Sequence, residues 1–150
     1  MIKIAICDDE KELLCEYENR ILKFMNQEKI VAKVETYQSG YFLLSDIEEN
    51  RYFDLIFLDI EMPGMNGMEI AEKLKNFLPH ILIIFITLHN EYVYDSFELS
   101  VFRFIPKYQI DKRINQVIKD AVSYIMMEQN EAYTIETQNR MERILYKDIL

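Results

Sequence analysis

Short apolar runs alternate with amphipathic segments along most of the chain, and this alternation restricts the fold more than any other feature. Continuous apolar runs rich in β-branched residues predict buried strands, whereas apolar residues repeating every three or four positions predict helices. The predicted strands cover residues 2–7, 31–37, 54–59, 81–86 and 101–105. The predicted helices lie between and after them, around residues 14–24, 39–47 (with Ser39 as its cap), 68–77, 91–99 and 114–125.

Strict alternation of strands and helices, with central strands that are apolar throughout, predicts a parallel sheet covered by helices on both faces. A Rossmann arrangement would need a glycine-rich turn after the first strand. The chain instead has Asp8-Asp9-Glu10 there, which would repel a pyrophosphate. We therefore expect an α/β, flavodoxin-like (βα)5 doubly wound sheet with strand order 2-1-3-4-5. Its ligand crevice opens where strands 1 and 3 end.

Composition excludes several classes of protein. The 150 residues suit one main domain, and a net charge of −9 argues against nucleic-acid binding by this segment. The longest apolar run, 81–86, is too short to span a bilayer, and the N-terminus lacks a signal-peptide pattern. We expect a cytoplasmic protein with no membrane partner. Cys7 and Cys15 are too few for a disulfide scaffold, and we expect both to be buried thiols.

Polar residues follow four of the predicted strands. Asp8 and Asp9 follow the first, Asp59 ends the third, Thr87 follows the fourth and Lys107 follows the fifth. Parallel strands end at the same edge of the sheet, so these side chains should surround one crevice. Three neighbouring carboxylates repel one another, and a hard divalent cation such as Mg²⁺, which prefers oxygen ligands, relieves that repulsion.

Each of these residues also has a simpler explanation. Asp9 could cap the first helix, with Glu12 completing a capping box. Thr87 could merely cap or turn the chain, and Lys107 could be a solvated surface charge. That polar residues follow four predicted strands, all ending at one edge of the sheet, favours a shared site over these separate explanations.

The residues Asp8-Asp9, the string Asp59-Ile60-Glu61-Met62-Pro63-Gly64-Met65-Asn66-Gly67, Thr87 and Lys107 resemble the receiver domain of bacterial two-component response regulators. The resemblance covers residues 1–127. It implies a signalling domain rather than an enzyme, in which Asp59 accepts a phosphoryl group from a sensor histidine kinase with Mg²⁺ as cofactor.

The resemblance also implies the role of each site residue. Asp9, Asp59 and the backbone carbonyl of Glu61 would bind Mg²⁺ directly, and Asp8 would act through water. Thr87 and Lys107 would contact phosphoryl oxygens. Phe104 would turn inward with Thr87 as the switch, although core packing in the fifth strand explains its position equally well.

The chain departs from the family pattern beside two of these residues. Leu88 stands where receivers usually have a small residue, so it could crowd the phosphate pocket. Tyr108 follows Lys107 where a cis proline is usual, while Pro106 precedes it and could itself be cis. Glu61 and His89 flank the route of an attacking water, so we expect these two and Leu88 to tune the lifetime of the acyl phosphate.

Residues 128–150 differ in character from the rest. After a polar stretch, residues 133–137 and 143–146 are predicted to form two short strands, which resemble the opening of a LytTR-type DNA-binding output domain. Most of such a domain would be missing, so DNA would be contacted only through that missing part. Phosphorylation-dependent homodimerisation is left open.

Two rival functions fit part of the pattern. Asp59-Ile60-Glu61 offers a nucleophile and a second carboxyl group, as in Mg²⁺-dependent phosphohydrolases of the haloacid-dehalogenase type. Those enzymes, however, need a larger chain with a cap region. A pseudo-receiver that keeps the fold without the chemistry would explain Leu88 and Tyr108, but the complete set of site residues weighs against it.

Overall fold

The structure is a computed structural model that describes residues 1–88 and 99–149, with side chains described as far as residue 130. Its elements are β1 (Ile2–Cys7), α1 (Lys11–Gln27), β2 (Ala32–Tyr37), α2 (Gly40–Glu48), β3 (Leu55–Asp59), α3 (Gly67–Phe77), β4 (Leu82–Thr87), β5 (Arg103–Pro106), the 3-10 helix η2 (Lys107–Gln109) and α5 (Ile110–Ile149). The predicted helix at 91–99 falls outside the described residues, apart from its last position.

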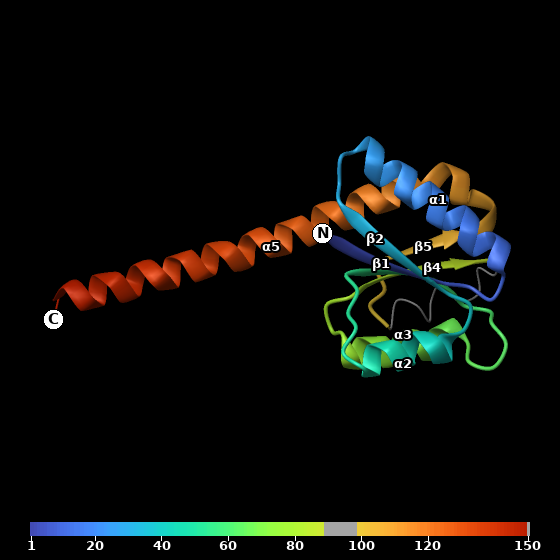
Figure 1. The fold of residues 1–150 in the computed structure, drawn as a ribbon, viewed down its shortest axis with the longest axis horizontal. Helices are drawn as coiled ribbons and strands as arrows, with labels where there is room; N and C mark the ends of the chain where they lie inside the picture. Colours follow the sequence, from blue (N-terminus) through green and yellow to red (C-terminus); the bar gives the residue numbers. More distant parts are fainter. Residues whose placement is uncertain (89–98, 150) are drawn as a thin grey trace.

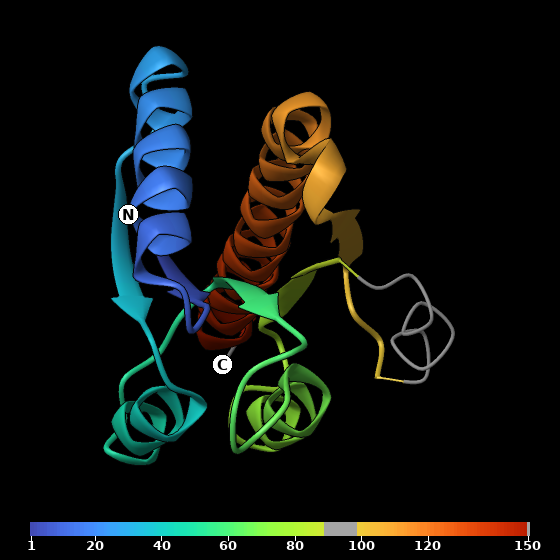
Figure 2. The ribbon, with the colours of Figure 1, turned by 90° about the vertical axis from the view of Figure 1, so that its right-hand side faces the viewer.

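The five strands form one parallel sheet in the order β2-β1-β3-β4-β5, which confirms the predicted order. Helices α1 and α5 cover one face, and α2 and α3 cover the other (Figures 1 and 2). The arrangement puts the ends of β1 and β3 side by side in the middle of the sheet.

Alternation along β1 separates two hydrophobic cores, because successive side chains of a strand point to opposite faces. Ile2, Ile4 and Ile6 pack in the core beneath α1 and α5, whereas Ala5 and Cys7 pack in the core beneath α2 and α3. Strands β3 and β4 are buried along their whole length. The carboxylates therefore follow two strands that are held firmly between the two cores.

Side-chain caps begin two of the helices. The Ser39 hydroxyl accepts a hydrogen bond from the backbone N–H of Tyr41 at the start of α2, as predicted. The Asn66 side chain accepts one from the backbone N–H of Glu69 at the start of α3. The alternative role for Asp9 as cap of the first helix is wrong, because Glu10 occupies the N-cap position of α1 and makes no side-chain capping bond. Asp9 is left available to the crevice.

The predicted strands at residues 133–137 and 143–146 are wrong, because α5 continues as a helix to Ile149 and projects from the body (Figure 1). The chain contains no glycine or proline after Pro106 to end a helix. A strand needs a neighbour to satisfy its backbone, and a helix satisfies its own. The division of the chain near residue 127 stays a prediction.

Two further predictions concern the cysteines and the membrane. Cys7 is buried as predicted, but Cys15 is exposed, because it lies on the solvent side of α1 beside the buried Leu14. Within the described residues, no helix combines the length and apolar character needed to cross a bilayer.

Candidate functional site

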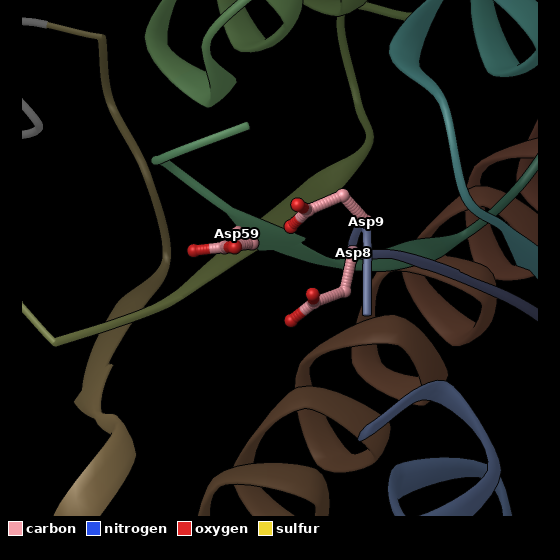
Figure 3. Close-up of side chains that lie close together, drawn as sticks. All are labelled: Asp8, Asp9 and Asp59. Atoms are coloured by element: carbon pink, nitrogen blue, oxygen red, sulfur yellow. The ribbon is translucent and has the colours of Figure 1, made fainter. Parts of the chain in front are cut away.

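Three aspartates meet at the carboxyl ends of the two central strands (Figure 3). Asp59 is the last residue of β3, and Asp8 and Asp9 directly follow β1, whose Cys7 pairs with Leu58. One carboxylate oxygen from each aspartate lies within 4.8 Å of the others. The pairing of adjacent parallel strands thus brings together charges that are 50 residues apart in the sequence, as predicted.

The three carboxylates differ in their surroundings. Asp8 and Asp59 are buried, at 1% and 4% exposure, whereas Asp9 is exposed. One oxygen of Asp8, Oδ1, accepts a hydrogen bond of 2.9 Å from the backbone N–H of Glu10. The other, Oδ2, has no hydrogen-bond donor in good geometry among the described residues. A buried acceptor without a donor is costly, so this oxygen is suited to a cation.

The side chain of Lys107 places a positive charge beside the two buried carboxylates. Lys107 begins η2, directly after β5, and its Nζ lies 3.4 Å from Asp59 Oδ2 and 3.4 Å from Asp8 Oδ2. Its side chain is only 14% exposed. The alternative that Lys107 is merely a solvated surface charge is therefore wrong. One lysine cannot balance three carboxylates, so the cluster keeps an excess of negative charge.

The pKa values of the aspartates and of Lys107 reflect this excess of negative charge. Burial and, after it, the neighbouring Asp8 carboxylate together raise the pKa of Asp59 to about 6. Lys107 and a hydrogen bond from the backbone N–H of Glu61 act in the opposite direction. Burial also raises the pKa of Asp8. For Lys107, burial lowers the pKa, but the two carboxylates outweigh burial and leave it above its usual value.

The donor set fits Mg²⁺. It consists of hard oxygen ligands, includes the buried Asp8 Oδ2, which makes no hydrogen bond in good geometry among the described residues, and carries a negative charge that one lysine leaves unbalanced. Cys7, the nearest thiol, is not a competing soft ligand. Burial and the neighbouring carboxylates raise its pKa to about 12, so it stays protonated. Its Sγ lies 3.9 Å from Met62 Sδ.

A model of the response regulator receiver domain matches residues 4–119 of the chain. The chain belongs to this family. A receiver domain is a signalling domain rather than a conventional enzyme, so the resemblance noted in the sequence is confirmed for the receiver part. The rival assignment to haloacid-dehalogenase-type phosphohydrolases finds no support in this match.

Relatives of the receiver domain include sensory transduction protein LytT from Bacillus subtilis, 30% identical over 79% of this chain and 47% of LytT. Transcriptional regulatory protein YpdB from Escherichia coli K12 is 29% identical over 93% of this chain and 55% of YpdB. The chain spans about half the length of these relatives. Among solved structures, response regulator protein TrrA from Thermotoga maritima, in complex with Mg²⁺-BeF, matches with a TM-score of 0.62 at 26% identity, over 81% of this chain and 99% of TrrA.

The structure also places the two predicted switch residues of the receiver domain. Thr87 ends β4 and is fully buried, and β4 lies between β3 and β5 in the sheet. Thr87 pairs in register with Pro106, the residue before Lys107, so it lies at the same edge as the carboxylates. Phe104 is half-buried in β5 and packs against the core beneath α2 and α3.

The remaining predicted residues differ in exposure and in whether the structure describes them. Glu61 is exposed, and the exposed fraction of Leu88 is 63%. His89 lies outside the described residues. Pro106 is trans, because the described part of the chain contains no cis peptide bond. Tyr108, in η2, is 68% exposed.

The sequence interpretation missed the backbone donors of the site. The N–H groups of Glu10 and Glu61 hydrogen-bond to Asp8 and Asp59. Every residue except proline carries such a donor, so residue types contain no signal for it. Only the conformation of the loops after β1 and β3 directs these two groups at the carboxylates.

Proposed function

We propose that Asp59 accepts a phosphoryl group from a sensor histidine kinase in a Mg²⁺-dependent reaction and thereby switches a transcriptional output. The observation that carries the proposal is the position of Lys107 Nζ, 3.4 Å from both buried carboxylates of the cluster. A lysine held there would also contact a phosphoryl group on Asp59 and, together with Mg²⁺, balance part of its charge.

In the proposed reaction, a carboxylate oxygen of Asp59 attacks the phosphorus of the kinase's phosphohistidine. The new O–P bond forms as the P–N bond breaks, and the imidazole keeps the electron pair and takes a proton from solvent. The transfer depends mainly on positioning and on charge neutralisation. Lys107 holds Asp59 in place and balances part of the added charge.

Asp9, Asp59 and the backbone carbonyl of Glu61 would hold the Mg²⁺, and Asp8 would act through water. When bound, Mg²⁺ neutralises the oxygens around the transferring phosphoryl group and orients them. The cluster of three carboxylates supports this assignment. The TrrA structure, a complex with Mg²⁺-BeF, supports it from a related protein.

The proposed switch starts at Thr87. A phosphoryl oxygen on Asp59 would accept a hydrogen bond from the Thr87 hydroxyl, and the resulting shift of β4 would reposition Phe104 on the adjacent strand. Thr87 and Phe104 lie on neighbouring strands, since β4 and β5 pair directly and Phe85 is in register with Phe104. Two packings of Phe104 against its core would give the two states.

The transcriptional output would belong to a longer protein. YpdB is a transcriptional regulatory protein and this chain spans about half of it, which supports a LytTR-type DNA-binding part beyond the receiver. DNA contact through that part alone would be compatible with the net charge of −9 on this chain, which disfavours direct contact with DNA. The proposal includes the predicted cytoplasmic location, where the kinase would act, and leaves phosphorylation-dependent homodimerisation as an outcome to measure.

Intact-mass measurement after incubation with acetyl phosphate, with and without Mg²⁺, tests the proposal. We expect one acid-labile phosphoryl group per chain, only with Mg²⁺, and none in Asp59→Asn. Continuous release of phosphate from an ester would favour a phosphohydrolase. A folded wild-type chain that acquires no phosphoryl group, either from acetyl phosphate or from a phosphorylated kinase, would contradict the proposal and favour a pseudo-receiver.

A further inference from the structure

The first turn of α3 rests directly on the backbone that carries Asp59. The backbone N–H of Gly67, the first residue of α3, donates a hydrogen bond of 2.7 Å to the carbonyl oxygen of Ile60. This bond closes the loop that contains Glu61, whose own N–H bonds to Asp59. These two hydrogen bonds join the start of α3 to the end of β3 through a short loop beside Asp59.

A side chain at residue 67 would not fit beside this loop. A Cβ atom there would lie 2.3 Å from the carbonyl oxygen of Asp59, 2.7 Å from Cα of Ile60 and 2.9 Å from the carbonyl carbon of Asp59. All three are backbone atoms, so rotating a side chain cannot relieve the overlap. Backbone conformation is not the reason for glycine, because Gly67, unlike Gly64, does not have a positive φ.

We infer that Gly67 is a positioning residue for the phosphoacceptor: its missing side chain lets α3 press against Asp59 and hold the Asp59 carboxylate and the Glu61 carbonyl where Mg²⁺ is bound. The inference rests on the proposed function and deepens it. A Cβ at this position must push α3 away from β3. The three carboxylates that meet within 4.8 Å would then lose their mutual placement.

Gly40→Ala is the matched control for Gly67→Ala. Gly40 is likewise the first residue of a helix, α2, on the same face of the sheet. Its added Cβ would also lie very close to other atoms, but these are side-chain atoms of the buried Ile70, Cδ1 at 2.3 Å and Cγ1 at 2.9 Å, and not backbone. Both variants therefore add one methyl group at a tight helix start, and only Gly67→Ala disturbs the backbone of Asp59.

The experiment measures Mg²⁺ binding by calorimetry in the whole 150-residue chain, and checks by urea unfolding that each variant is folded. We expect Gly67→Ala to bind Mg²⁺ about tenfold or more weakly than the wild type, the size of effect seen when the support of a metal ligand is lost. Gly40→Ala should bind Mg²⁺ as the wild type does. A folded Gly67→Ala variant with wild-type Mg²⁺ affinity would overturn the inference.

A second measurement needs no variant and decides the matter if Gly67→Ala does not fold. The chain has only three glycines, so selective ¹⁵N-glycine labelling yields three assignable amide signals. On Mg²⁺ titration the Gly67 signal should shift and saturate, and the Gly40 signal should stay nearly fixed. A Gly67 signal unmoved at saturating Mg²⁺ would overturn the inference alone. A wild-type chain that binds no Mg²⁺ would instead overturn the proposed function, and the inference with it.

Discussion

The ammonium group of Lys107 lies 3.4 Å from the Asp59 carboxylate, although 48 residues separate the two in the sequence. The same group lies 3.4 Å from Asp8. The lysine side chain is therefore the shared partner of two buried acids that would otherwise repel each other. Stability and the proposed phosphoryl acceptance should be coupled at this point, because both would depend on balancing the same charges.

Lys107→Ala should destabilise the chain and slow phosphorylation together. Its removal leaves two buried carboxylates without their counter-charge, and we expect the free energy of unfolding to fall by about 1–3 kcal/mol without metal at pH 7.5. Urea unfolding measures the change, and Lys112→Ala, at an exposed position of α5, is the control. Equal stability of the two variants would show that Lys107 does not balance the cluster.

The sequence was sufficient to predict the sheet order and the acidic cluster. Parallel strands end at one edge, so residues that follow β1 and β3, namely Asp8 and Asp59, had to meet once the strand order was known. The position of Lys107 beside these carboxylates followed from the end of β5 in the same way, although β5 begins two residues later than predicted.

Features that depend on three-dimensional packing were not predictable from residue types. Cys15 adjoins the buried Leu14, and only the exact rotation of α1 leaves it exposed. The predicted strands at 133–137 and 143–146 relied on local residue preferences, but strands need partners, and the helix α5 satisfies its own backbone. The close contact between Gly67 and the backbone of Asp59 could not be predicted either, because a residue type does not indicate how near other atoms lie.

Asp59→Asn should stabilise the metal-free chain at neutral pH. The folded state holds the Asp59 proton with a pKa of about 6, above its ordinary value of 3.8, so it binds more protons than the unfolded state between these values. Wild-type stability should therefore fall as the pH rises through this window. At pH 7.5 we expect Asp59→Asn to be more stable by about 1–3 kcal/mol, and at pH 3.5 the difference should largely vanish.

Urea unfolding across this pH range, with EDTA present, measures the effect of Asp59→Asn. Glu28→Gln, which removes an exposed carboxylate, is the control and should show no such window. A variant less stable than the wild type at pH 7.5 would mean that the folded structure does not penalise the Asp59 charge.

Changes at the rim of the site should alter how long the phosphoryl group survives. Glu61→Asn and His89→Ala are expected to change the rate of dephosphorylation, because in the sequence these residues stand two positions after Asp59 and two after Thr87, where the sequence interpretation expects the attacking water to approach. Leu88→Ala should speed labelling by acetyl phosphate, since it opens the position next to Thr87. Intact mass followed over time measures phosphoryl loss in the first two variants and phosphoryl gain in Leu88→Ala. Unchanged rates in every variant would assign the control of labelling and lifetime to other residues.

Asp9→Asn should separate metal binding from stability. Asp9 is the exposed member of the cluster, so losing its charge should leave the metal-free stability near that of the wild type. A ligand that binds only the folded state stabilises it by about 2.7 kcal/mol at a hundredfold excess over its Kd. We expect Mg²⁺ to stabilise the wild type in this way, EDTA to reverse the effect, and Asp9→Asn to show little of either.

Calcium should substitute poorly for Mg²⁺, because Mg²⁺ keeps the tighter octahedral geometry that a few carboxylates and waters can provide. Equal stabilisation of wild type and Asp9→Asn by Mg²⁺ would remove Asp9 from the ligand set and leave Asp8 and Asp59 as its carboxylates.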